Sequence, residues 1–157
     1  MTGFPGLRTA MDGRAFTDPE HCRDTIKGLV ELGANSLLVL VEREELEDLA
    51  FEVLEQICAA MKVTVSYQSI TDYSVPNHEF SEWWASHRPD REAVFAAGGT
   101  MAFACQYGAG RSGMMAALCL IEQGVAPDDA MARVRDAFPP AVESDAQEAW
   151  LRNRGDG

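Results

Sequence analysis

The sequence lacks the segments that would tie a protein to a membrane or to a secretory route. No apolar run is long enough to span a bilayer. Residues 1–16 do not place a basic start before an apolar stretch, as a secretory signal would. We therefore expect a cytoplasmic protein.

Basic residues are scarce. The chain has 13 lysines and arginines against 25 aspartates and glutamates, which gives a formal net charge of −12. A surface of this charge repels nucleic acids and anionic membranes at long range, so neither is an expected partner. An anionic ligand would have to be captured by a local site, because the overall field opposes its approach.

Cysteines are few, and none has a metal-binding spacing. The four are Cys22, Cys58, Cys105 and Cys119, and none of them forms C-x-x-C or lies at zinc-finger spacing from a histidine. We expect free thiols in a reducing compartment and no metal site. Cys58 and Cys119 fall in apolar helical patterns, which indicates inert core positions. Cys105 does not fit that description.

The chain also lacks repeats, low-complexity tracts and long linkers. Its 157 residues suffice for one domain with a core, so we predict a single domain over 1–157. Apolar periodicity predicts helices over 18–33, 42–62, 111–124, 127–138 and 144–152, helical pieces over 79–87 and 89–98 broken near Pro89, and strands over 35–41, 63–67 and 100–105. This alternation predicts an α/β fold with a mainly parallel central sheet flanked by helices. Ligands of such sheets bind beyond the carboxyl ends of the strands, where Cys105 lies.

Cys105 opens a glycine-rich loop that reads C-x-x-G-x-G-R-S-G up to Gly113. Glycines free the backbone, so that consecutive N–H groups can turn inward and bind an anion. The helix that starts near Arg111 adds unpaired N–H groups and its positive dipole end, and the guanidinium can hold two phosphate oxygens. The loop is thus predicted to bind a tetrahedral oxyanion. The predicted phosphate-binding residues are Gln106, Tyr107, Gly108, Ala109, Gly110 and Arg111.

A thiol at the floor of this loop would be a nucleophile. A free cysteine titrates near ~8.5, and a helix N-terminus with a nearby arginine lowers that pKa by several units. The Cys105 thiolate would face the phosphorus of a bound ester, and Ser112 could donate a hydrogen bond to the sulfur as it leaves. The loop is not the ATP-type phosphate loop, because it has no lysine. The simpler alternative is a glycine turn with Cys105 as a small buried hydrophobic residue.

The segment CQYGAGRSG resembles the signature loop of the cysteine-dependent protein tyrosine and dual-specificity phosphatases. Most of the chain resembles small single-domain members, such as the dual-specificity and kinase-associated phosphatases. The resemblance implies a Cys-x5-Arg loop between a strand and a helix, and a phosphocysteine on Cys105 that water hydrolyses. It also implies phosphate binding by Arg111, assistance from Ser112, and no metal or other cofactor. The family usually has a histidine where this chain has Ala104, which implies a less activated thiol.

Ester cleavage also requires an acid for the leaving oxygen. Asp72 is the best candidate, because it follows the strand 63–67 on a loop with Pro76 nearby, which resembles the general-acid loop of the family. Glu79 and Asp90 are poorer choices, since both fall in predicted helical pieces. Asp72 could instead be an ordinary turn residue. Gln147 resembles a glutamine in a late helix of some relatives.

Three functions fit these residues. The first is a metal-independent phosphatase for phosphomonoesters. Its substrate would be a phosphorylated protein (phosphotyrosine, phosphoserine or phosphothreonine) or a small phosphate ester. The loop would bind a phosphate- or sulfate-like anion. The second is a phosphate-binding module without turnover, which Ala104 motivates. The third is a rhodanese-like sulfur carrier, which also holds a cysteine in an amide cradle. The glycine and Arg-Ser-Gly pattern argues against the third.

Overall fold

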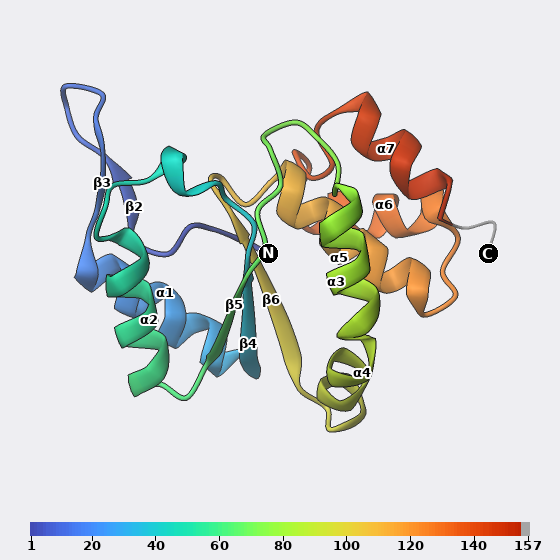
Figure 1. Ribbon diagram of the computed structural model, residues 1–157, viewed down its shortest axis with the longest axis horizontal. Coiled ribbons are helices and arrows are strands. Elements are labelled where there is room, and N and C mark those ends of the chain that lie inside the picture. The colour runs from blue at the N-terminus through green and yellow to red at the C-terminus, as the bar shows by residue number, and fades with distance from the viewer. Residues whose placement is uncertain (155–157) are drawn as a thin grey trace.

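A parallel four-stranded sheet divides the structure, a computed structural model that describes residues 1–154, into two helical layers (Figure 1). The strand order is β1-β6-β4-β5, and the strands are β1 Thr2–Gly3, β4 Ala34–Val39, β5 Thr64–Tyr67 and β6 Thr100–Cys105. On one face lie α1 Pro19–Glu31 and α2 Ala50–Ala60. On the other lie α3 His78–Ser86, α4 Arg88–Ala96, α5 Gly110–Glu122, α6 Pro127–Ala137 and α7 Asp145–Arg152. The predicted α/β class, with a parallel sheet flanked by helices, is confirmed.

The central strand β4 supplies a core on each side of the sheet. Leu37 and Val39 pack with α1 and α2, whereas Leu38, and Leu40 just after the strand, pack with the helices of the other layer. Successive side chains of a strand point to opposite faces, so a strand covered on both faces is apolar throughout. This explains the continuous apolar run from which the strand was predicted.

The two elements that carry the glycine-rich loop are both buried. Strand β6 pairs with β1 on one side and β4 on the other, and α5 packs directly on it. Helix α5 is buried along most of its length, as its apolar sequence predicts. The loop therefore runs from the carboxyl end of an inner strand into a buried helix N-terminus, which is a rigid support for a ligand site.

The acidic segment before α2 is not helical, so the prediction of one helix over 42–62 is wrong there. A single 3₁₀ turn, η1 Arg43–Glu45, is followed by an extended Leu46 with φ −122° and ψ 162°. The Glu45 carboxylate accepts the N–H of Glu42 at 2.8 Å and also pairs with Arg111. These contacts hold the segment in a turn, and they outweigh its local preference for a helix.

The break between α3 and α4 lies at His87, close to Pro89, as predicted. Pro89 occupies the first turn of α4, where a residue without an N–H costs no helical hydrogen bond. The two predicted helical pieces are otherwise confirmed. Within residues 1–154, no helix combines the length and apolar character needed to cross a membrane.

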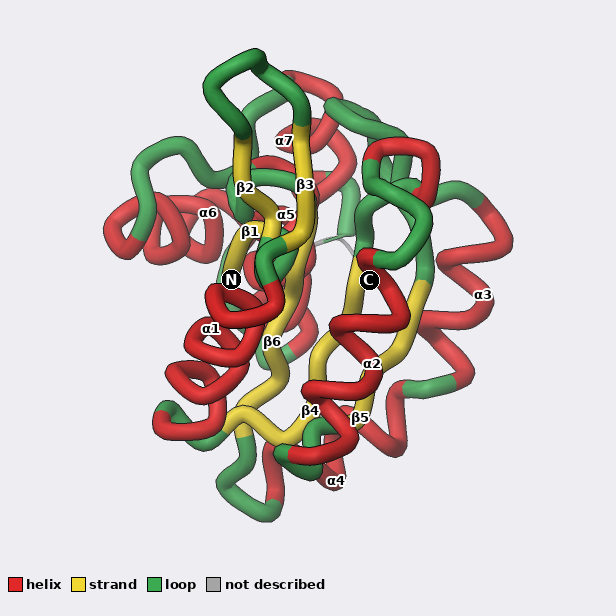
Figure 2. Tube along the Cα trace, turned by 90° about the vertical axis from the view of Figure 1, so that its left-hand side faces the viewer, coloured by secondary structure: helices red, strands yellow, loops and turns green. Residues whose placement is uncertain are grey.

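The N-terminal segment forms strands that the sequence pattern did not predict. Besides β1, it makes the hairpin of β2 Leu7–Thr9 and β3 Ala15–Thr17. These strands have two or three residues each, which is too short for an alternating pattern to be read. The hairpin projects at the end of the molecule where the carboxyl ends of β4, β5 and β6 lie (Figure 2).

Candidate active site

The loop between β6 and α5 depends on glycine at two close approaches. Gly108 has φ +79°, and a Cβ there would lie 2.5 Å from the backbone nitrogen of Gly3 on β1. A Cβ on Gly113 would lie 2.8 Å from the Cβ of Ala141. The first glycine allows the loop to curl over β1, and the second allows the first turn of α5 to pack closely on the chain before α7.

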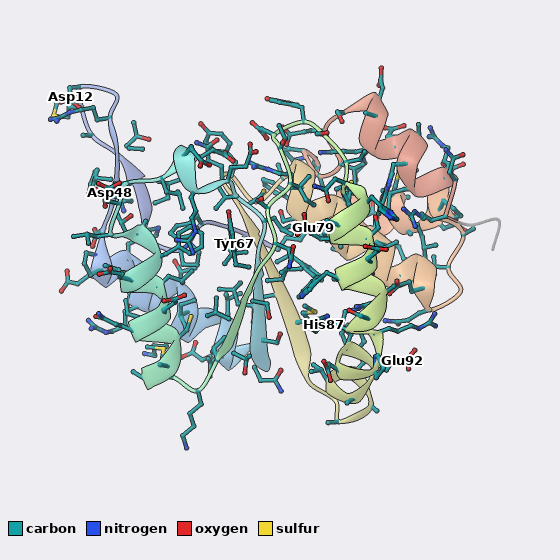
Figure 3. All side chains as sticks on the ribbon, viewed as in Figure 1. Asp12, Asp48, Tyr67, Glu79, His87 and Glu92 are labelled. Atoms are coloured by element: carbon teal, nitrogen blue, oxygen red, sulfur yellow. The ribbon has the colours of Figure 1, made fainter. Side chains whose placement is uncertain are left out.

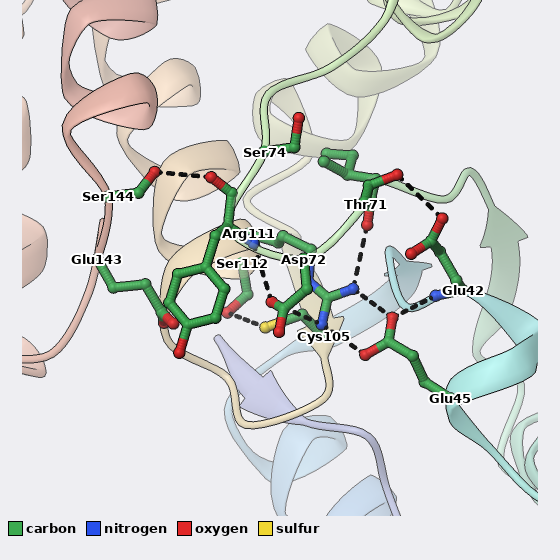
Figure 4. A network of polar contacts seen from close by, with 12 residues as sticks. Glu42, Glu45, Thr71, Asp72, Ser74, Cys105, Arg111, Ser112, Glu143 and Ser144 are labelled. Carbon is green, nitrogen blue, oxygen red and sulfur yellow. Dashed lines mark hydrogen bonds and ion pairs between the residues drawn. The ribbon is translucent and has the colours of Figure 1, made fainter.

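The sulfur of Cys105 lies inside this curl. The residue is 3% exposed. Its Sγ accepts the N–H of Gly108 at 3.2 Å. The sulfur also lies 3.4 Å from the hydroxyl oxygen of Ser112 (Figure 4). The Gly108 N–H stabilises a negative charge on the sulfur, and the Ser112 hydroxyl is close enough to donate to it once the thiol has lost its proton.

The other backbone donors of the loop are free for a ligand. Within residues 1–154, the N–H groups of Tyr107, Ala109, Gly110 and Arg111 donate no hydrogen bond to another protein group. The Tyr107 side chain points outward and is exposed, while Gly108 to Gly110 are buried. Unpaired donors at a buried helix start are the arrangement that binds an oxyanion.

Arg111 lies beside the loop with its guanidinium held in place. It is 2% exposed, and Nη1 and Nη2 donate to the two carboxylate oxygens of Glu45 at 2.5 and 2.9 Å. Nη1 also donates to the Ile70 carbonyl at 3.0 Å. Burial alone would lower the pKa of Arg111, but the hydrogen bonds and charge of Glu45 outweigh it and raise that pKa. Burial acts against the charge of Glu45 as well, yet Arg111 keeps the pKa of this carboxyl below its usual value.

Asp72 reaches the same guanidinium from the loop between β5 and α3. Its Oδ1 lies 3.2 Å from Nη2 of Arg111, and its side chain is 41% exposed. The N–H of Tyr73 donates to the same oxygen at 3.1 Å. The structure thus brings Cys105 and Ser112, and Arg111 and Asp72, into contact at one end of the sheet, and their catalytic roles stay predictions.

The alternative acids lie elsewhere. Glu79 projects from α3 and is exposed (Figure 3), and Asp90 is exposed on α4. The carboxylates that contact Arg111 are those of Glu45 and Asp72.

The side chain of Ala104 cannot contribute to the candidate site. It precedes Cys105 on β6 and is fully buried in the core shared with α1 and α2, on the sheet face opposite to the one that receives the sulfur. Its carbonyl accepts the N–H of Leu40 at 2.8 Å. A larger polar side chain at this position would enter an apolar core beneath the loop.

The remaining cysteines are core residues. Burial raises the pKa of Cys22 to about 11 and those of Cys58 and Cys119 to about 12. Within residues 1–154, no three histidine, cysteine, aspartate or glutamate side chains are grouped so as to hold a metal ion.

Three further residues border the site, although the sequence analysis gave none of them a role there. Glu45 is an acidic residue in an acidic run, so nothing in the sequence set it apart from a helix surface. Glu143 lies over the start of α5, because a Cβ on Gly110 would be 2.8 Å from its carboxyl oxygen. Gln147 is fully buried beside the Asp72 loop. The resemblance of Gln147 to a glutamine of some relatives was the only signal for this group.

Known structures share this fold. No family model and no curated protein sequence matches the chain. Among solved structures, Tk-PTP in its active form is 24% identical over 98% of both chains, with a TM-score of 0.69. A kinase associated phosphatase whose catalytic cysteine is replaced by serine is 17% identical over 96% of this chain and 82% of that chain, with a TM-score of 0.72. Human DUSP28 is 16% identical over 97% of this chain and 93% of that chain, with a TM-score of 0.62. The chain has the fold of the protein-tyrosine and dual-specificity phosphatase superfamily, as its Cys105–Gly113 loop indicated.

Proposed function

We propose that the protein is a metal-independent phosphatase that hydrolyses phosphomonoesters through a phosphocysteine on Cys105. One observation carries the proposal. A buried sulfur receives the Gly108 N–H and lies beside the Ser112 hydroxyl, next to unpaired loop amides and a fixed guanidinium. A phosphate group fits this set of donors, and its phosphorus would then face the sulfur.

In the first step, the Cys105 thiolate attacks phosphorus. The S–P bond forms, the ester P–O bond breaks, and the leaving oxygen takes a proton from Asp72. Arg111 and the loop amides hold the three remaining phosphoryl oxygens, whose charge they stabilise in the transition state. Glu45 fixes the guanidinium in advance, so that binding does not have to order it.

In the second step, water attacks the phosphocysteine. Asp72, now a carboxylate, accepts a proton from the water, a new P–O bond forms, and the S–P bond breaks. The Ser112 hydroxyl donates a hydrogen bond to the departing thiolate. Inorganic phosphate leaves, and the thiolate and the protonated Asp72 are restored.

The substrate is a phosphorylated protein or a small phosphate ester. Phosphotyrosine and phosphoserine or phosphothreonine remain alternatives that a substrate panel separates. The net charge of −12 disfavours polyanionic substrates, because long-range repulsion slows their approach. The cytoplasm is the proposed location.

A second candidate is a phosphate-binding module without turnover. The buried Ala104 favours it, since the family histidine that tunes the thiol is replaced there. This module would bind phosphate or vanadate in the loop and would release no product. Sulfur transfer is not proposed, because the fold is that of the phosphatases.

The test is turnover of p-nitrophenyl phosphate in the presence of a metal chelator. Wild type should release p-nitrophenol, and Cys105→Ser should not. Cys119→Ser is the matched control, because it changes a buried thiol in α5 outside the loop. Equal rates for wild type and Cys105→Ser would remove the mechanism, and vanadate binding with no turnover would favour the second candidate.

A further inference from the structure

The loop that carries Asp72 is tied down at its first residues. Arg111 donates to the Ile70 carbonyl at 3.0 Å, and the Thr71 hydroxyl donates to the carboxylate of Glu42 at 3.0 Å. Both partners belong to the network around the guanidinium (Figure 4). The start of the loop is therefore fixed by the same residues that hold Arg111.

The end of the loop is held by two side chains at the start of α7. The Ser144 hydroxyl donates to the Tyr73 carbonyl at 2.8 Å, and Nε2 of Gln147 donates to the Ser74 carbonyl at 3.2 Å. We call Ser144 and Gln147 the clamp. In the sequence, Asp72 lies directly between Thr71, which Glu42 anchors, and Tyr73, which the clamp holds.

Both polar atoms of the Gln147 side chain are occupied. While Nε2 binds Ser74, Oε1 accepts the N–H of Glu143 at 3.0 Å, and the side chain is fully buried. Ser144 is used twice as well, because its hydroxyl oxygen also accepts the N–H of Gln147 at 3.2 Å and so caps α7. Both ends of the Gln147 side chain are thus bound to the protein, and its complete burial keeps it away from a ligand in the loop.

The backbone on both sides of the clamp is strained. Tyr73 has φ +55° and Val142 has φ +57°, which are left-handed conformations that non-glycine residues, and above all β-branched ones, rarely adopt. Such conformations persist only where surrounding contacts enforce them. Without the clamp, Tyr73 would relax, and the adjacent Asp72 would move with it.

We propose that Ser144 and Gln147 are positioning residues that hold Asp72 over the Cys105 loop before substrate arrives. The inference rests on the proposed function. Asp72 needs such support, because its carboxylate is partly exposed and, among residues 1–154, is held only by Arg111 and its own neighbour Tyr73. The clamp affects the reaction through Asp72 and touches neither substrate nor phosphate.

The test compares Ser144→Ala and Gln147→Glu on two substrates. Gln147→Glu keeps the acceptor for Glu143 and loses the donor to Ser74, and Ser144→Thr keeps the hydroxyl. General acid catalysis contributes about 10²- to 10⁴-fold, and a misplacement of about 1 Å can cost about a hundredfold. We expect kcat for phenyl phosphate, a poor leaving group, to fall about tenfold or more in Ser144→Ala and Gln147→Glu, as a partial loss of that acid catalysis. On p-nitrophenyl phosphate the fall should stay within about twofold, since this leaving group needs little protonation. Ser144→Thr should restore the rate.

A double-mutant cycle separates positioning from a merely structural role. If the clamp acts through Asp72, Ser144→Ala should lower kcat in the wild-type background and have no further effect in Asp72→Asn. Asp18→Ala is the matched control, because Asp18 caps α1 as Ser144 caps α7 but lies on the other helical layer. It should lower the melting temperature and leave the ratio of the two substrate rates unchanged.

Two results would overturn the inference. One is an equal fall on both substrates, and the other is an additive effect of Ser144→Ala in Asp72→Asn. Failure of the proposed function is a separate outcome, because it would show as a wild-type protein with no turnover, or as a Cys105→Ser variant that matches wild type.

Discussion

Neutralising Glu45 should destabilise the fold in a way that depends on pH. Glu45→Gln replaces the carboxylate that accepts both Nη1 and Nη2 of Arg111. Hydrogen bonds to charged groups contribute about 1.5–3 kcal/mol each, and orphaning a buried charge costs about 3–5 kcal/mol. Arg111 is not orphaned in this variant, because the Ile70 carbonyl and Asp72 remain at 3.0 and 3.2 Å.

We therefore expect a loss at the low end of these ranges. Since Glu45 keeps part of its side chain in solvent and glutamine still offers one acceptor, the free energy of unfolding should fall by about 2 kcal/mol. For a protein of this size, that corresponds to a fall in Tm of about 4–8 °C. The assay is thermal and urea unfolding at pH 7. Glu44→Gln is the control, because it removes the same charge from an exposed position in the same 3₁₀ turn.

The pH dependence follows from the direction of the shift. The pKa of Glu45 is lowered from 4.5 in the folded protein. A group of this kind contributes stability that is fully present above its unfolded pKa and is lost as pH falls through its folded pKa. The gap between wild type and Glu45→Gln should thus be constant from neutral pH down to about 5 and should close below about 4.5. A gap that widens with acid, or a variant as stable as Glu44→Gln at pH 7, would refute the reasoning.

Three further predictions concern the candidate site. Asp72→Asn should slow phenyl phosphate turnover by about a hundredfold or more and p-nitrophenyl phosphate far less, and equal slowing would remove the acid role. Gly108→Ala should abolish turnover, because its Cβ would clash with the backbone of β1. Gly124→Ala is the control: residue 124 has φ +90° but open space around it, so the change should lower the free energy of unfolding by only about 1–2 kcal/mol. Activity and urea unfolding are measured for both variants. Iodoacetamide at pH 8 should label Cys105 before the other thiols, whose pKa values are about 11 or 12, and a peptide map showing a core cysteine labelled first would contradict this.

The sequence predicted the parts of the site that are local in the chain. The Cys105–Gly113 loop carries its chemistry in nine consecutive positions, so its strand, its turn and its helix start could all be inferred from spacing. Asp72 was expected on a loop after the strand 63–67, and the carboxyl ends of parallel strands share one edge of the sheet, which is where the structure places it beside Arg111. The catalytic roles of these residues stay predictions.

Contacts between residues far apart in the chain could not be predicted from the sequence, for a physical reason. Glu45 and Arg111 are 66 positions apart. In the sequence, a glutamate that pairs with a distant arginine cannot be distinguished from a glutamate on a solvent-exposed helix. The acidic run at 42–48 therefore favoured a helix, whereas the contacts of Glu45 with the Glu42 N–H and with Arg111 hold the segment in a turn. The clamp was hidden in the same way, since Ser144 and Gln147 bond to backbone carbonyls more than 70 positions away. The short N-terminal strands carry too few residues for periodicity to show.

Whether the Cys105 sulfur accepts the phosphoryl group can be measured in an acid-quench experiment. Wild-type protein is mixed with excess p-nitrophenyl phosphate, quenched in acid within the first turnover, and mapped by mass spectrometry. We expect a phosphoryl group on the peptide that contains Cys105 and none on the corresponding peptide of Cys105→Ser. A turning-over enzyme whose quenched phosphoryl group lies on another residue would contradict this expectation.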